Sequence, residues 1–158
     1  MIQTVILAGG NSSTTKDAIK KAEQEISARI GEVVSVSEWH TTEPWGFKCD
    51  NAFTNRAYVV NTELRATEVL ETLLEIEVQA GRNRRAEYKE KVLRGENYAS
   101  RVIDLDILLY GDTITVTPHL QIPHPKLLER DFALVPMCEA LGLEISEARD
   151  YVRKIIEQ

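Results

Sequence analysis

Two aspartates stand two positions apart in a segment that otherwise has the composition of a buried strand. Asp104 and Asp106 interrupt the apolar run 102–110. Because side chains alternate along a strand, both carboxylates should lie on one face, with their backbones about 6–7 Å apart. The opposite face would carry Ile103, Leu105, Ile107 and Leu109. Strand propensity does not favour aspartate, so the pair needs a chemical explanation.

Two carboxylates this close require a compensating cation or the uptake of a proton. Oxygen ligands at this spacing suit Mg²⁺ that is bound together with substrate phosphates, because Mg²⁺ rarely has a site built from protein alone. A solvated acidic face on an edge strand would produce the same pattern. The pair Asp104 and Asp106 alone does not separate these two interpretations.

A basic segment directly precedes the aspartates. Residues 82–101 hold seven basic and three acidic residues, a net charge of +4 in a chain whose overall charge is −6. Guanidinium groups bind phosphate oxygens in a bidentate fork, which suits a Mg²⁺–triphosphate site. The segment lacks hydrophobic periodicity, which predicts a mobile loop that closes over a nucleotide; a loop that only confers solubility is the alternative. The basic residues are Arg82, Arg84, Arg85, Lys89, Lys91, Arg94 and Arg101.

Other polar and aromatic residues could bind a ligand, although each also has a structural interpretation. Glu77 falls on the apolar stripe of a predicted helix, where it either orients an arginine or marks the edge of the stripe. Phe53 and Asn55 could stack on a flat heterocycle and hydrogen-bond its edge, but core packing is the commoner role of phenylalanine. His124 lies between two prolines that constrain its backbone, and it suits either a phosphate or a hydrogen bond within its loop.

The bulk composition excludes several classes of protein. The chain has 158 residues, 43% apolar and 28% charged, as expected for one soluble domain. Its net charge of −6 argues against a general nucleic-acid or anionic-membrane binder. The first residues do not have the pattern of a signal peptide, and Cys49 and Cys138 lack metal-site spacing, so we expect a cytoplasmic protein with reduced thiols. No P-loop motif is present.

The order of elements predicts an α+β fold. Strands are expected at 2–8, 33–41, 56–64 and 102–110, with a short strand at 113–116; helices are expected at 16–30, 67–80, 132–140 and 146–157. The order β-α-β-β-α-β predicts a ferredoxin-like core with an antiparallel sheet, helices on one face and additional C-terminal helices. We expect a single domain over 1–158.

Several short motifs together resemble one enzyme family. They occur in order as Leu7–Asn11, Thr42–Gly46, Phe53–Asn55, Glu77, Gly81–Arg84, Arg101–Leu108, Ile122–Pro125 and Arg130–Phe132. In this combination the sequence resembles the 6-hydroxymethyl-7,8-dihydropterin pyrophosphokinases. Some positions depart from the family pattern: Gly10 replaces a serine, Tyr98 replaces a tryptophan, and the segment 82–101 is longer. His119 stands where some members have a basic residue, and we leave it out of the predicted site.

The resemblance implies transfer of pyrophosphate from Mg·ATP to 6-hydroxymethyl-7,8-dihydropterin, giving AMP and the pterin diphosphate, in folate biosynthesis. It implies two Mg²⁺ ions on Asp104 and Asp106, with Arg82 and Arg101 as further catalytic residues. The implied ATP-binding residues are Glu77, Arg82, Arg84, Tyr98, Arg101, Ile103, His124 and Arg130. The implied pterin-binding residues are Thr42, Pro44, Trp45, Phe53, Asn55, Asp104 and Phe132, with Phe53 and Phe132 on opposite faces of the ring. A monomer that binds neither nucleic acid nor membrane is expected.

Two other functions remain open from the residues alone. Another metal-dependent nucleotidyl or phosphoryl transferase would use the same aspartates without preferring a pterin. A non-catalytic ferredoxin-like module that senses a nucleotide would tolerate the loss of Asp104 and Asp106.

Overall fold

The computed structural model describes residues 1–42, 52–95 and 100–158. Its main sheet contains β1 (Ile2–Gly10), β2 (Gly31–Val36), β3 (His40–Thr42), β4 (Phe53–Thr62) and β5 (Asp104–Tyr110). The strand order is β2-β4-β1-β5, β3 also pairs with β4, and all of these pairings are antiparallel. This order confirms the predicted ferredoxin-like core.

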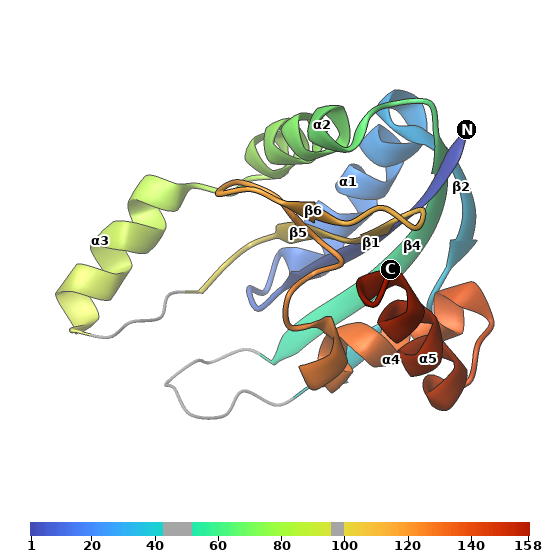
Figure 1. The fold of residues 1–158 in the computed structure, drawn as a ribbon. Helices are drawn as coiled ribbons and strands as arrows, with labels where there is room; N and C mark the ends of the chain where they lie inside the picture. The colour runs from blue at the N-terminus through green and yellow to red at the C-terminus, as the bar shows by residue number, and fades with distance from the viewer. Residues whose placement is uncertain (43–51, 96–99) are drawn as a thin grey trace.

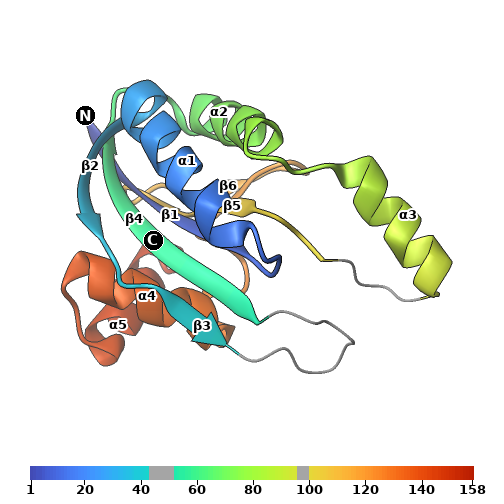
Figure 2. The ribbon, with the colours of Figure 1, turned by 180° about the vertical axis from the view of Figure 1, so that it is seen from behind.

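Helices cover both faces of the sheet, so the prediction of helices on one face was incomplete. On one side lie α1 (Thr15–Arg29) and α2 (Ala66–Gln79); on the other lie α4 (Asp131–Leu141) and α5 (Ile145–Ile156) (Figures 1 and 2). Alternation along the central strand explains the two cores, because Ile6 packs in the first core and Val5 and Leu7 pack in the second. The C-terminal helices therefore bury a second apolar face.

The alternation of side chains predicted one continuous apolar face on strand β5, and this prediction was wrong. Leu105 and Ile107 pack in the core under α1 and α2, but both Leu108 and Leu109 pack in the core under α4 and α5. The cause is a register shift against β1, where Val5 pairs with Leu109 and Ile6 with Ile107. Such a bulge reverses the facing of every residue after it. The two aspartates precede the shift and keep a common face.

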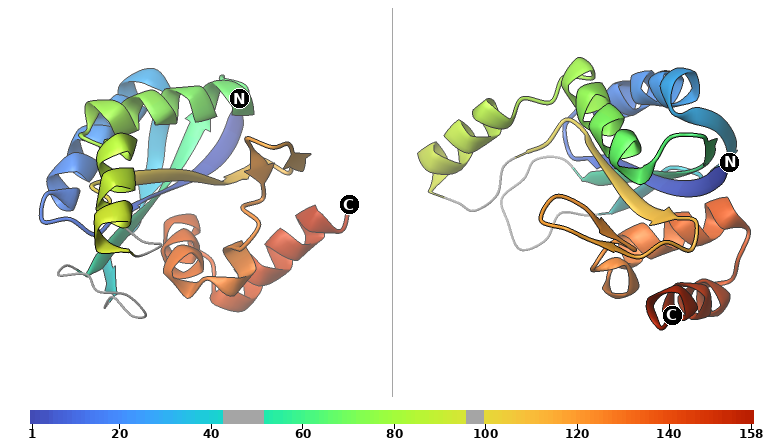
Figure 3. Two further views of the ribbon diagram at one scale, coloured as in Figure 1. Left: turned by 90° about the vertical axis from the view of Figure 1, so that its left-hand side faces the viewer. Right: turned by 45° about the horizontal axis from the view of Figure 1, so that its top comes forward.

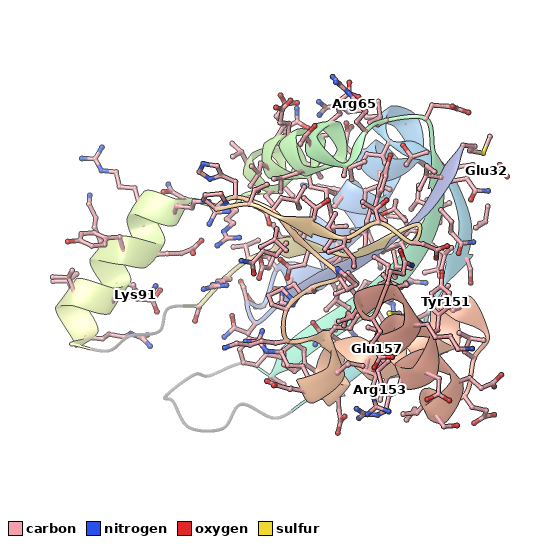
Figure 4. All side chains as sticks on the ribbon, viewed as in Figure 1. Glu32, Arg65, Lys91, Tyr151, Arg153 and Glu157 are labelled. Carbon is pink, nitrogen blue, oxygen red and sulfur yellow. The ribbon has the colours of Figure 1, made fainter. Side chains whose placement is uncertain are left out.

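The basic segment contains a helix, so the prediction of a loop throughout 82–101 was wrong. Helix α3 (Arg84–Arg94) begins at Asn83, whose side chain accepts a hydrogen bond from the Ala86 N–H, and ends at Gly95 in the left-handed conformation. Its residues are mostly good helix formers, although none of them is buried. In Figures 1 and 3, α3 extends away from the sheet, and side chains such as Lys91 project outward (Figure 4).

The remaining short elements follow β5. A hairpin of β6 (Thr115–Val116) and β7 (Gln121–Ile122) is followed by a 3₁₀ turn (Leu127–Glu129) that leads into α4. The predicted strand 33–41 is divided into β2 and β3, because residues 37–39 leave the ladder. Within the described ranges, no helix has the length and apolar composition needed to cross a membrane.

Candidate active site

The two aspartates lie beside a glycine of β1 that is flanked by polar residues on the neighbouring strands. Gly9 pairs with Asp104 on β5 and with Asn55 on β4, so the three residues form one row across the sheet. Directly paired residues share a face, and Asp106 pairs with Leu7 on that same face. A Cβ on Gly9 would lie 2.4 Å from Asn55 Oδ1, so only glycine leaves room for the Asn55 amide between the strands.

Arg82 is the centre of a buried ion-pair network. Its Nη1 donates to Asp104 Oδ1 at 3.0 Å and to Glu77 Oε2 at 3.3 Å, and its Nε and Nη2 donate to the two Glu87 oxygens at 3.1 and 3.3 Å. The Arg82 side chain is only 5% exposed. Buried charges are tolerated when they are paired and hydrogen-bonded, and here one guanidinium serves three carboxylates.

Glu77 orients both arginines of the 81–84 motif. Its Oε1 accepts from Arg84 Nη2 at 3.1 Å, and its Oε2 accepts from Arg82 and, at 2.7 Å, from the Leu105 N–H. The side chain is 3% exposed, and burial raises the pKa of Glu77 against the opposing effects of the Leu105 amide and Arg82. Of the two interpretations open from the sequence, the geometry supports the one in which Glu77 orients an arginine.

The turn after β1 fixes the position of Arg101. The Asn11 side chain accepts from the Arg101 N–H at 2.8 Å, and the Asn11 N–H donates to the Arg101 carbonyl at 2.9 Å. Gly10 allows this close approach, because its Cβ would lie 2.6 Å from the Val102 oxygen and 2.9 Å from the Arg101 oxygen. Held in this way, Arg101 Nη1 lies 3.3 Å from Asp104 Oδ2. No chemical feature of the sequence singles out Asn11 for this role.

Asp106 carries the excess negative charge of the site. Burial, with repulsion from Asp104 and Glu77, raises the pKa of Asp106 to about 7, although Arg101 and Arg82 partly offset the effect. In the part of the chain that the structure describes, no group of three or more histidine, cysteine, aspartate or glutamate residues is arranged to hold a metal ion. The two aspartates offer hard oxygen ligands, and such a donor set fits a divalent cation that takes its other ligands from a substrate.

His124 is held as a hydrogen-bond donor. Its backbone N–H donates to the Leu108 carbonyl at 3.0 Å, and its ring Nδ1 accepts from the Lys126 N–H at 3.3 Å. A neutral imidazole that accepts at Nδ1 carries its proton on Nε2. Burial and the positive charges of Arg130 and Lys126 lower the pKa of His124, so the neutral form dominates near pH 7.

We therefore expect His124 to titrate below its ordinary value of 6.5 in the folded protein. Because the folded pKa is depressed, the associated stability is present above pH 6.5 and is lost as the pH falls through the folded pKa. Ring ¹⁵N chemical shifts measured against pH give both the midpoint and the tautomer. A midpoint above 6.5, or a proton on Nδ1, would contradict this arrangement.

A cleft of about 320 Å³ lies beside Asp106 and His124. It is lined by Leu70, Leu105, Asp106, Ile107, Pro118, His119, Leu120, Gln121, His124 and Pro125. His119, which we left out of the predicted site, therefore lies in it, because the β6–β7 hairpin folds against the edge of the sheet. Ile103 does not line it, because the residue is fully buried in the core under α1 and α2.

The aromatic residues lie on β4 and α4, and a histidine–glutamate hydrogen bond links α4 to β3, the strand next to β4. Phe53 begins β4, and Phe132, 41% exposed, lies in the first turn of α4 with the Arg130 guanidinium 5.5 Å from its ring centroid. Glu139, near the other end of α4, lies 3.0 Å from His40 Nε2 on β3, the strand that pairs with β4 at Phe53 and Asn55.

Four predicted residues are not tested by this geometry. Pro44, Trp45 and Tyr98, together with the side chain of Thr42, lie outside the described residues. The structure brings the other predicted residues to one end of the sheet and its flanking elements, apart from the side chain of Ile103. Their roles toward a ligand remain predictions.

Comparison with known proteins agrees with the motifs. The family model for 7,8-dihydro-6-hydroxymethylpterin-pyrophosphokinase (HPPK) matches residues 5–142. The 2-amino-4-hydroxy-6-hydroxymethyldihydropteridine pyrophosphokinase of Porphyromonas gingivalis is 30% identical over 132 residues, which cover 83% of this chain and 85% of the relative. The protein of the same name from Haemophilus influenzae is 28% identical, over 100% of this chain and 93% of the relative.

A solved structure shares the fold. The crystal structure of wild-type HPPK-DHPS from Plasmodium falciparum aligns with a TM-score of 0.65 at 14% identity, over 99% of this chain and 46% of that chain. The present chain thus spans less than half of that longer chain. The family match over residues 5–142, together with the similarity to the Porphyromonas gingivalis relative, confirms the resemblance found from the motifs. The chain belongs to the 7,8-dihydro-6-hydroxymethylpterin-pyrophosphokinase family.

Proposed function

We propose that this protein transfers the pyrophosphoryl group of ATP to the hydroxymethyl group of 6-hydroxymethyl-7,8-dihydropterin, producing AMP and the pterin diphosphate for folate biosynthesis. The observation that carries the proposal is the association of Asp104 and Asp106 with Arg82 and Arg101 beside a cleft. Family membership supports this substrate pair, because the two relatives are named for the same activity.

We assign the nucleotide to the cleft and the adjoining basic residues. The adenosine occupies the cleft between α2 and the β6–β7 hairpin, where Leu70, Ile107 and Leu120 supply apolar walls. The phosphates extend past Asp106 toward Arg82, Arg84 and Arg101, because guanidinium groups bind phosphate oxygens in a bidentate fork. His124 donates from Nε2 to a phosphate oxygen, and Arg130 adds a further positive charge. The proposed contribution of Tyr98 rests on the sequence alone.

We assign the pterin to the row of residues across β5, β1 and β4. The Asn55 amide, for which Gly9 leaves room, hydrogen-bonds the edge of the ring, and Phe53 and Phe132 enclose its faces. The His40–Glu139 pair holds β3 and α4 together and so fixes the separation of the two aromatic residues. The contributions of Thr42, Pro44 and Trp45 rest on the sequence alone.

Asp104 and Asp106 would hold magnesium, with two ions as the expected number. The donor set fits this role, since it offers two hard oxygen ligands, and burial together with the charges of Asp104 and Glu77 raises the pKa of Asp106 when no cation is bound. Bound magnesium would supply charge neutralisation to the phosphoryl oxygens. The remaining ligands would come from the substrates.

The protein's own contribution to the reaction is positioning and electrostatic stabilisation. We assign the pterin hydroxyl a position beside the row Asn55–Gly9–Asp104 and the acidic pair. From there it attacks the β-phosphorus opposite the oxygen that bridges to the α-phosphorus, and that oxygen leaves with AMP. Arg82 and Arg101 stabilise charge on the transferring group, and Glu77 and Asn11 hold these arginines in place before substrate binds. Neutral His124 acts as a donor rather than as a base.

Product analysis tests the proposed function. Incubation with ATP, magnesium and 6-hydroxymethyl-7,8-dihydropterin should yield AMP and the pterin diphosphate in equal amounts, because attack at the β-phosphorus releases AMP. Separation by anion-exchange chromatography with mass detection identifies both products. Formation of ADP and a pterin monophosphate, or no reaction with folded protein, would overturn the assignment.

We further propose that the protein acts in the cytoplasm as a monomer on small molecules, without nucleic acid or membrane partners. The net charge of −6 supports this proposal, because it opposes association with other polyanions. Light scattering coupled to size-exclusion chromatography measures the oligomeric state, with 17.9 kDa expected for one copy.

A further inference from the structure

Glu87 on helix α3 binds the guanidinium of Arg82 as a phosphate would. Its Oε2 lies 3.1 Å from Arg82 Nε and its Oε1 lies 3.3 Å from Nη2, so the carboxylate spans the fork of the arginine. The same Oε1 lies 3.9 Å from Arg101 Nε. Arginine recognises carboxylate and phosphate with the same bidentate geometry. One acidic side chain thus contacts the two arginines that we assign to the polyphosphate.

The Nη1 donors of Arg82 are already occupied by other carboxylates. Its Nη1 serves Asp104 and Glu77, which come from strand β5 and helix α2 of the body of the protein. Glu87 takes the remaining side of the guanidinium, from Nε to Nη2, and its side chain is only 14% exposed. An incoming polyphosphate must therefore displace Glu87 to obtain a bidentate contact with Arg82.

Glu87 belongs to an element that is weakly attached to the rest of the molecule. None of the residues of α3 is buried, and the helix extends away from the sheet (Figures 1 and 2). Glu87 lies in its first turn, where a negative charge is favourable but a neutral glutamine is tolerated. The contact between Glu87 and Arg82 can therefore break without opening either core. Glu77 and Asp104, in contrast, belong to helix α2 and strand β5, which pack in the body of the protein.

We propose that Glu87 is a built-in competitor for the polyphosphate of the nucleotide, which occupies Arg82 in the free enzyme and is displaced when the nucleotide binds. This inference rests on the proposed function. The competition neutralises Arg82 and Arg101 between turnovers, and it weakens nucleotide binding by the free energy needed to break the Glu87 contacts. A merely structural Glu87, which only holds Arg82 in position, predicts the opposite effect on affinity.

The test is the dissociation constant of α,β-methylene-ATP with magnesium. In this analogue a methylene group replaces the oxygen that bridges the α- and β-phosphorus atoms, so the pyrophosphoryl group cannot be transferred. Isothermal titration calorimetry compares the wild type with Glu87→Gln. The variant should bind about tenfold more tightly, the size expected when a charge-assisted hydrogen bond no longer competes. Glu87→Ser removes the carboxylate altogether and should shift the affinity in the same direction, so the test does not depend on one variant.

Glu90→Gln is the matched control. Glu90 follows Glu87 by three positions on the same helix and has the same charge. It pairs with Arg94 at 3.4 Å. Its replacement removes one negative charge from the same helix without touching Arg82, so it measures the general electrostatic effect. We expect its dissociation constant to change by less than about twofold, as for a partly exposed pair.

The outcomes separate the two proposals. Tighter binding by both Glu87 variants, with Glu90→Gln near the wild type, supports the competitor role. Equal or weaker binding by folded Glu87 variants, with a wild type that binds the analogue, overturns that role and leaves the proposed function intact. A wild type that binds no analogue in the presence of magnesium contradicts the proposed function itself, and the competitor role with it.

Discussion

Replacing Asp106 with asparagine should abolish pyrophosphoryl transfer and at the same time stabilise the free protein at neutral and alkaline pH. The loss of turnover should reach at least about 10³-fold, because the variant removes a charged ligand that we assign to the metal-bound phosphates. The gain in stability follows from the raised pKa of Asp106, since its ionised form is disfavoured in the folded state. The same charge that serves the substrate therefore destabilises the empty site.

The sign of the pH effect follows from proton binding. The pKa of Asp106 rises from 3.8 to about 7 on folding, so between these values the folded protein holds a proton that the unfolded chain has released. The contribution of this residue to the free energy of unfolding falls as the pH rises through that window. At about pH 8 the asparagine variant should exceed the wild type by about 1–4 kcal/mol, and at about pH 4 the difference should vanish.

Urea denaturation at several pH values, together with the activity assay, measures both effects. Asp150→Asn is a suitable control, because Asp150 is exposed on α5 and pairs only loosely, at 3.9 Å, with Arg153. It should change neither turnover nor the pH dependence of stability. An Asp106→Asn variant that keeps its activity, or that loses stability at pH 8 while remaining folded, would contradict the assignment of Asp106.

Replacing Arg82 with glutamine should cost about 3–5 kcal/mol of folding stability, the penalty for leaving buried carboxylates without their counter-charge. Glu77, Glu87 and Asp104 all depend on this one guanidinium. Lysine should not restore the loss, because a single ammonium group cannot serve three carboxylates from a planar fork. Chemical denaturation of the free proteins measures the change.

Arg84→Gln is the control for Arg82. Arg84 also pairs with Glu77, at 3.1 Å, but its side chain is 60% exposed. Its loss should cost less than about 1 kcal/mol, as for exposed ion pairs. A double-mutant cycle with Glu77→Gln should show strong coupling for Arg82 and weak coupling for Arg84. Similar effects for the two arginines would mean that burial does not determine the strength of this network.

The sequence was sufficient to predict the sheet and the acidic pair, because both depend on local patterns. Alternation predicts β1, β4 and β5, and two aspartates in an apolar strand are conspicuous at any register. The facing of Leu109 could not be predicted, since it depends on a register shift against a strand about a hundred residues away in the chain. Pairing between distant strands leaves no local signal.

The prediction of a loop over 82–101 was wrong at 84–94 for a different reason. No residue of helix α3 is buried in a core, so the apolar periodicity that indicates most helices is missing. The available signals were Asn83 and Gly95, which cap the helix. The partners of Arg82 could not be predicted from the sequence either, because Glu77, Glu87 and Asp104 lie on three separate elements. His119 lies in the cleft because the β6–β7 hairpin carries it there, and its neighbours in the sequence contain no signal for that placement.

A crystal structure of the protein with magnesium, α,β-methylene-ATP and 6-hydroxymethyl-7,8-dihydropterin tests the central assignment most directly. We expect both Asp104 and Asp106 to coordinate magnesium that carries the β- and γ-phosphates, with Arg101 in contact with the same phosphates. Phosphates that bind elsewhere, with the two carboxylates facing solvent and no cation between them, would contradict it.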